Sequence, residues 1–254
     1  MSEHIQTDFQ DGIAHIRIHR PDKKNALTLD MYTAMADALE KADADEGIRA
    51  LFLTGTGNCF TSGNDILDFI QSPPTGEDSP VGRFLAAITQ ARKPLVAAVN
   101  GLAIGVGTTM LLHCDLVYAA SEARFQMPFV NLGLCPEAGS SMLLPRMIGH
   151  QRASELLLLG DPFSAEQARE MGLVNAVFPA AELEEGALAR ARQLAAKAPK
   201  ALQISKALLK GQQAEALEAA MQAEFEHFSA LLKGPEAAEA LSAFMEKRKP
   251  DFSS

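Results

Sequence analysis

The sequence has few cysteines and no excess of positive charge, and each shortage excludes a class of protein. Its 254 residues include three cysteines, Cys59, Cys114 and Cys135, which form no CxxC motif or other metal-ligand spacing. An odd number of cysteines argues against a disulfide framework, so we interpret all three as reduced thiols. The formal net charge is −9, whereas nucleic-acid binding needs a basic surface. We therefore expect no nucleic-acid partner.

Membrane-spanning and targeting segments are also missing. A membrane helix would need a run of about 18 apolar residues, and the sequence has none. The N-terminal MSEHIQTDFQDG lacks the apolar region of a signal peptide, and the C-terminal PDFSS is not a peroxisomal signal of the SKL type. These absences predict a cytoplasmic location and no membrane partner. The histidines show neither HExxH nor paired spacing, so no metal is expected.

Apolar patterns predict strands that alternate with helices through about residue 180. Residues 12–19 (GIAHIRIH) alternate in hydrophobicity and predict a strand, and residues 27–45 have helical spacing, with Asp30 as the candidate cap. Three continuous apolar runs are typical of strands buried on both faces: 49–55, 93–101 and 115–120. This alternation predicts an α/β fold. Residues 71–80 (QSPPTGEDSP) are expected to form a mobile surface loop.

The chain becomes almost wholly helical after Ala181. Three segments end near proline or glycine: AELEEGALARARQLAAKA, PKALQISKALLKG and QAEALEAAMQAEFEHFSALLKG. We therefore divide the chain into a core, residues 1–180, and a helical region, residues 181–254. An apolar stripe of Met221, Phe225 and Phe228 is expected to lie in the core or at a subunit contact. Most basic residues of this region are expected to be solvated: Lys197, Lys200, Lys206, Lys210, Lys247, Arg248 and Lys249.

Two glycine-rich turns each follow a buried strand and precede a helix. They are TGTGNCFTSGNDI (54–66) and NGLAIGVGTTM (100–110), and neither matches a Walker A loop or GxGxxG. Glycines permit close backbone approach to a ligand, and N–H groups at a helix start can hold negative charge. Two such turns could each direct one amide at the same oxygen, as in an oxyanion hole. Each turn taken alone favours the interpretation as an ordinary strand-to-helix connection.

An isolated carboxylate, Glu137, occupies the apolar turn GLCPEAGSS (133–141). If this side chain is buried without a partner, low dielectric favours its protonated form and raises its pKa. The alternative is a solvated turn or a helix N-terminus, where a glutamate suits the helix dipole. The segment alone favours this alternative.

The order and spacing of the motifs resemble the crotonase (enoyl-CoA hydratase/isomerase) superfamily across essentially the whole chain. The matching blocks are HRPDKKNALT, CFTSGNDILDF, RKPLVAAVNGLAIGVG, CDLVYAASEARFQMPFVNLGLCPEAGSS and GDPFSAEQAREMGLVNAVFP. The resemblance implies a spiral of ββα units followed by C-terminal helices that serve in oligomerisation and cover the active site. It also implies trimers or dimers of trimers, an acyl-CoA thioester substrate and no cofactor besides the CoA of the substrate. By position, the amides of Asn64 and Val106 would stabilise a thioester enolate.

Within this superfamily, hydratases use two glutamates, and the matching positions here are Thr109 and Phe129. Efficient hydration is therefore not expected. PEAGSS and SGND resemble instead the turns of peroxisomal Δ3,Δ2-enoyl-CoA isomerases, in which one glutamate is the acid and base. The resemblance thus implies that Glu137 moves a proton from C2 to C4 of a 3-enoyl-CoA. Alternatives are another acyl-CoA reaction (hydration or thioester hydrolysis) or a non-catalytic RNA-binding relative, which the −9 charge opposes.

The resemblance further implies a set of residues along the bound CoA: Lys24, Ala26, Leu27, Ser62, Gly63, Asn64, Asp65, Ile66 and Gly105. Asp65 is also a candidate helix cap, and the sequence alone favours capping. Lys23 and Lys24 are equally well interpreted as solvated. One or two of the basic residues in the helical region are candidates for CoA phosphates, also across a subunit boundary. Ser140 and Ser141 are expected to be structural or capping residues.

Overall fold

The computed structural model describes residues 2–71, 76 and 78–253. A six-stranded sheet has the order β1-β2-β3-β5-β7-β10, in which only β1 and β2 are antiparallel. Its strands are β1 (Ile5–Gln10), β2 (Ile13–Ile18), β3 (Ala50–Gly55), β5 (Leu95–Val99), β7 (Leu116–Ala120) and β10 (Ala176–Phe178). The strands expected from residues 12–19, 49–55, 93–101 and 115–120 are therefore confirmed. All residues of β3 and β5 are buried, which explains their continuous apolar sequences.

A smaller, four-stranded sheet has the order β4-β6-β8-β9. Its strands are β4 (Cys59–Thr61), β6 (Leu102–Ile104), β8 (Arg124–Gln126) and β9 (Phe163–Ser164). Successive strand pairs, β3 with β4, β5 with β6 and β7 with β8, send their first strand to the large sheet and their second to the small sheet. Each pair thus forms one turn of a spiral, and the α/β fold class predicted from the sequence is confirmed.

The helices of the first 180 residues connect these strands or pack beside them. They are η1 (Pro21–Lys23), α1 (Leu29–Ala44), α2 (Ile66–Gln71), α3 (Pro80–Gln90), α4 (Val106–Thr109), η2 (Met110–His113), η3 (Val130–Leu132), α5 (Ser140–Ile148), α6 (His150–Ser154), η4 (Glu155–Leu159) and α7 (Ala165–Glu170). The cap expected at Asp30 is wrong: Thr28 has an extended backbone, and its hydroxyl accepts a hydrogen bond from the Met31 N–H at 3.3 Å. Half of the loop expected at 71–80 lies outside the described residues, and its two end residues belong to α2 and α3.

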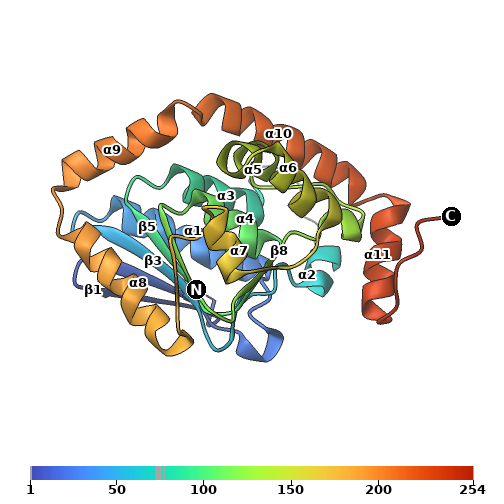
Figure 1. Cartoon of the computed structure of the whole chain (residues 1–254), viewed down its shortest axis with the longest axis horizontal. Coiled ribbons are helices and arrows are strands. Elements are labelled where there is room, and N and C mark those ends of the chain that lie inside the picture. Colours follow the sequence, from blue (N-terminus) through green and yellow to red (C-terminus); the bar gives the residue numbers. More distant parts are fainter. Residues whose placement is uncertain (1, 72–75, 77, 254) are drawn as a thin grey trace.

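Four helices complete the chain: α8 (Ala180–Ala195), α9 (Pro199–Gly211), α10 (Ala214–Leu231) and α11 (Pro235–Met245). Helix α8 packs on the six-stranded sheet and buries Leu183, Ala187 and Ala191. Helices α9 and α10 then run along the top of the molecule in Figure 1, and α11 stands at one end. The division between 1–180 and 181–254 stays a prediction, and α11 is a helix that the sequence motifs did not single out. Within the described residues, no helix is long and apolar enough to span a bilayer.

Candidate active site

The two glycine-rich turns lie against each other at one edge of the small sheet. Strands β4 and β6 are parallel neighbours, so the turns that follow them start side by side. Gly63 has φ +90°, and a Cβ at this position would lie 2.9 Å from the carbonyl oxygen of Ile104. A Cβ on Gly107 would lie 2.6 Å from Cγ2 of Thr61. Only glycine permits this approach at either position, so the glycines bring the two turns together.

Each turn presents a backbone N–H group, at Asn64 and at Val106, that donates to no acceptor among the described residues. Val106 is the first residue of α4, where a helix leaves its N–H groups unpaired. Within the described part of the chain, neither the Val106 N–H nor the Asn64 N–H donates a hydrogen bond, whereas the adjacent Asp65 N–H donates to the Leu27 carbonyl at 2.8 Å. The buried Tyr32 hydroxyl donates to Oδ1 of Asn64 and fixes that side chain. Two donors are thus available from neighbouring turns.

Glu137 faces a cavity of about 820 Å³ that also reaches Asn64. The cavity lies between α3 and η2 on one side and the arch of α9 and α10 on the other. Apolar side chains form most of the wall near Glu137, among them Phe69, Leu143 and Phe225. The apolar stripe of Met221, Phe225 and Phe228 lines this cavity, and Phe228 also packs against the hydrophobic core. A subunit contact of this stripe stays a prediction.

The carboxyl group of Glu137 has one hydrogen bond, from Oγ1 of Thr109 at 2.8 Å to Oε1. Among the described residues, no lysine, arginine or histidine forms an ion pair with it. Burial raises the pKa of Glu137 to about 7, the Thr109 hydrogen bond opposes this rise, and the nearby Glu224 charge adds to it. The group can therefore hold or release a proton near neutral pH.

A tight turn fixes the backbone on either side of Glu137. Ala138 has φ +59° and Gly139 has φ +72°, both in the left-handed region. The N–H and the hydroxyl of Ser140 donate to the Glu137 carbonyl at 3.0 and 2.6 Å, so the structural role expected for Ser140 is confirmed. Nε2 of His113 lies 2.8 Å from the Ala138 carbonyl. Because burial lowers the pKa of His113 to about 4, its ring is neutral and donates its Nε2 proton to that carbonyl.

A second buried carboxylate, Glu224 on α10, holds the same turn from the opposite side. Its side chain is 7% exposed and accepts the N–H groups of Gly139 at 2.6 Å and Ser141 at 2.8 Å. These N–H groups belong to the start of α5, where negative charge is favourable. Sequence reasoning missed Glu224. The signal was available, since Glu224 shares the helical face of Met221, Phe225 and Phe228 and is the only acid among them.

The two positions that hold glutamates in hydratases serve other purposes here. Thr109 is fully buried, and its hydroxyl contacts Glu137 rather than a second acid. Phe129 is buried at the start of η3. The Thr109 contact was also missed by sequence reasoning, because no local pattern links residues 28 positions apart.

The segments expected to lie along CoA are brought together. The Leu27 N–H donates to the Gly63 carbonyl at 2.8 Å, and the Ser62 N–H donates to the Lys24 carbonyl at 3.1 Å. This pairing places Lys24, Ala26 and Leu27 beside the first glycine turn. Asp65 accepts the N–H groups of Leu67 and Asp68 at the start of α2, so the expected capping is confirmed. Oδ2 of Asp65 also pairs with Arg20 at 2.6 Å.

Most basic residues of the helical region were expected to be solvated, but two of the lysines bind protein groups. Nζ of Lys206 pairs with Asp115 at 2.6 Å and donates to the Lys93 carbonyl, and Nζ of Lys210 donates to the His113 carbonyl at 2.8 Å. The other basic residues of this set are exposed: Lys197, Lys200, Lys247, Arg248 and Lys249.

Known proteins resemble this chain over nearly its full length. The family model for enoyl-CoA hydratase/isomerase matches residues 8–254. The 2,3-dehydroadipyl-CoA hydratase of Escherichia coli is 36% identical over 99% of both chains, and enoyl-CoA delta isomerase 2 of Rattus norvegicus is 36% identical over 98% of this chain and 65% of that protein. The structure of Pseudomonas aeruginosa OdaA shares 53% identity with a TM-score of 0.94, covering 96% of this chain and 99% of that one. The chain therefore belongs to the enoyl-CoA hydratase/isomerase (crotonase) family and is an enzyme of that family.

Proposed function

We propose that the protein is a Δ3,Δ2-enoyl-CoA isomerase in which Glu137 carries one proton between two carbons of the substrate. The observation that carries the proposal is the position of Glu137 in an apolar cavity, with a pKa raised by burial to about 7. A pKa near the working pH suits a group that must first accept and then return a proton.

In the proposed reaction, the Glu137 carboxylate removes a proton from C2 of a 3-enoyl-CoA. The electron pair moves onto the thioester oxygen, which accepts the N–H groups of Asn64 and Val106 as a dienolate. The Glu137 carboxylic acid then donates the same proton to C4, and the double bond now joins C2 and C3. The Thr109 hydroxyl stabilises the carboxylate form at the start and the end of the cycle. CoA is part of the substrate, and this series of reaction steps needs no other cofactor.

Hydration is the alternative reaction, and the names of several relatives include hydratase. It needs a second group to activate water, and the two matching positions hold Thr109 and Phe129. The test is to supply the purified enzyme with 3-enoyl-CoA and with 2-enoyl-CoA and to compare the rates. We expect isomerisation to be the faster reaction, and a hydration rate equal to or above it would contradict the proposal.

We further propose that the enzyme assembles as a trimer or a dimer of trimers. Helix α9 exposes a row of apolar side chains, Ile204, Leu208 and Leu209, which would be costly to leave in water. Light scattering of the purified protein tests this assembly, and a mass near the 27.2 kDa of one chain would contradict it.

A further inference from the structure

The cavity around Glu137 has an apolar part and a polar end. Side chains of α3 and α10 give the apolar part, for example Leu85 and Met221. Polar side chains from the end of α3, from α9 and from the start of α10 line the cavity as well, beside the apolar Ile204 and Leu209: Thr89, Gln90, Gln203, Lys210 and Gln213. An acyl chain that enters past Asn64 and extends beyond Glu137 could therefore meet polar groups.

Lys210 is one of the charged groups that line this part of the cavity, beside Arg92 and Lys206. Among the described residues, its Nζ donates one hydrogen bond, to the His113 carbonyl at 2.8 Å. Within the described residues, no carboxylate lies within ion-pairing distance of it, since Asp115 is paired with Lys206 one turn earlier on α9. Burial lowers the pKa of Lys210, and the adjacent Lys206 charge lowers it further. An ammonium group has three N–H bonds, so two are available to a ligand in the cavity.

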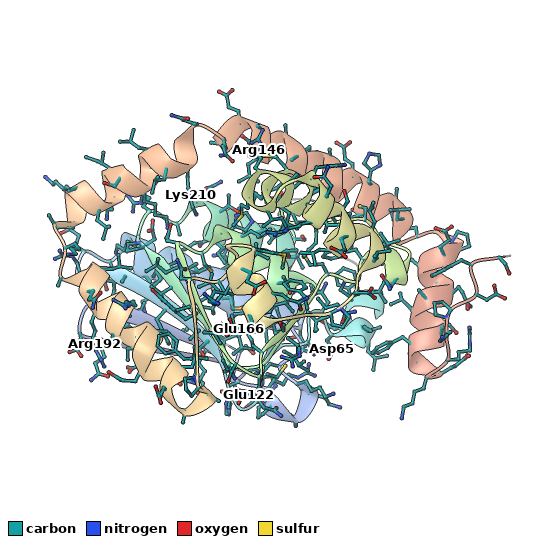
Figure 2. All side chains as sticks on the ribbon, viewed as in Figure 1. Asp65, Glu122, Arg146, Glu166, Arg192 and Lys210 are labelled. Carbon is teal, nitrogen blue, oxygen red and sulfur yellow. The ribbon has the colours of Figure 1, made fainter. Side chains whose placement is uncertain are left out.

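A single residue, His113, separates Lys210 from the turn that carries Glu137. The carbonyl of His113 accepts from Lys210, and its ring donates to the carbonyl of Ala138, the residue after Glu137. The Lys210 side chain points from α9 toward the core (Figure 2), and both Lys210 and Glu137 line the same cavity. One acyl group could therefore contact both residues.

We propose that the acyl cavity accepts chains that end in a carboxylate and that Lys210 binds this distal group. The inference rests on the proposed function only in placing C2 of the acyl chain at Glu137. A methyl end at this position would remove water from a partly buried ammonium group and give no hydrogen bond in return. A carboxylate would replace the water and supply the missing negative charge. Lys210 would then determine specificity rather than take part in proton transfer.

The test is a calorimetric titration of the whole enzyme with pairs of saturated acyl-CoA ligands that have the same number of carbons. One member of each pair ends in a methyl group and the other in a carboxylate. We expect the wild type to bind the carboxylate-ended ligand roughly tenfold more tightly at the chain length that reaches Lys210, as for a partly buried charge pair. Lys210→Met should remove this preference, Lys210→Arg should retain it, and Lys200→Met, an exposed control on α9, should not change it.

Two outcomes would overturn the proposal: equal or weaker binding of the carboxylate-ended ligands by the wild type at every length, or an undiminished preference in Lys210→Met. Lys210 also tethers α9 to η2, so Lys210→Gln, which keeps a donor without the charge, replaces the methionine variant if the latter does not fold. Saturated ligands cannot isomerise. An enzyme without isomerase activity would therefore still give a valid binding ratio, and the two proposals fail separately.

Discussion

Glu137 and Glu224 line the same cavity, yet their surroundings give the two carboxyl groups different properties. Burial raises the pKa of Glu224 as well, but this carboxylate accepts two backbone N–H groups at a helix start, and these bonds oppose the rise by favouring its charged form. Glu137 accepts one hydroxyl, and burial dominates, so its pKa rises to about 7. Two backbone N–H groups thus fix the Glu224 side chain, which in turn holds the turn that carries Glu137. Among the described residues, no backbone N–H group donates to the Glu137 carboxyl group, which can therefore exchange a proton.

The largest effect should follow from removing the proton carrier. Glu137→Gln keeps the size and polarity of the side chain but cannot accept a proton, so isomerisation should fall by about 10⁴-fold or more. Affinity for a saturated acyl-CoA should stay nearly unchanged. Glu218→Gln is a matched control, because Glu218 lines the cavity but is exposed, and its activity should resemble the wild type. Near-normal turnover by Glu137→Gln would remove Glu137 from the mechanism.

Removing the Glu224 carboxylate should lower the stability of the fold and also the activity. Glu224→Gln retains only one acceptor oxygen for two buried N–H groups, which should lower the free energy of unfolding by about 1–3 kcal/mol. Because the turn then holds Glu137 less firmly, turnover should fall by about tenfold. Denaturant unfolding and steady-state kinetics measure the two effects. Glu226→Gln, on the exposed face of the same helix, is the control, and an equal loss in both variants would refute the anchoring role.

The pH dependence of kcat/KM should move in opposite directions in two variants. The proposed reaction begins with ionised Glu137, so activity should decline as pH falls through its pKa. Thr109→Val removes a hydrogen bond that lowers this pKa, and the acidic limb should move to higher pH. Glu224→Gln removes a charge that raises it, and the limb should move to lower pH. Thr109→Ser, which keeps the hydroxyl, should match the wild type. Shifts of the same sign would mean that the limb does not report Glu137.

Most of the fold and part of the candidate site could be predicted from the sequence, for a physical reason. Buried strands such as β5 need continuous apolar sequence, and the turns at Gly63 and Gly107 need glycine, so both leave local signals. Glu137 itself lies in such a turn. Thr109 and Glu224 influence the pKa and the position of Glu137. Both are distant from Glu137 in the chain and reach it or its turn only through tertiary packing. No local pattern reports those contacts, although an acid on the apolar face of α10 was a visible irregularity.

The last expected effect concerns how pH changes the stability of the fold. Glu137 has a pKa of about 7 in the folded protein and about 4.5 when unfolded, so the folded state binds more protons between these values. Its ionisation therefore opposes folding increasingly as pH rises from about 4.5 to 7, reaching an order of 3 kcal/mol at most. Glu137→Gln does not ionise and avoids this cost. The difference in melting temperature between Glu137→Gln and the wild type should thus grow as pH rises through this interval and level off above it. A difference that is constant with pH would show that Glu137 has the same pKa in both states and is not desolvated.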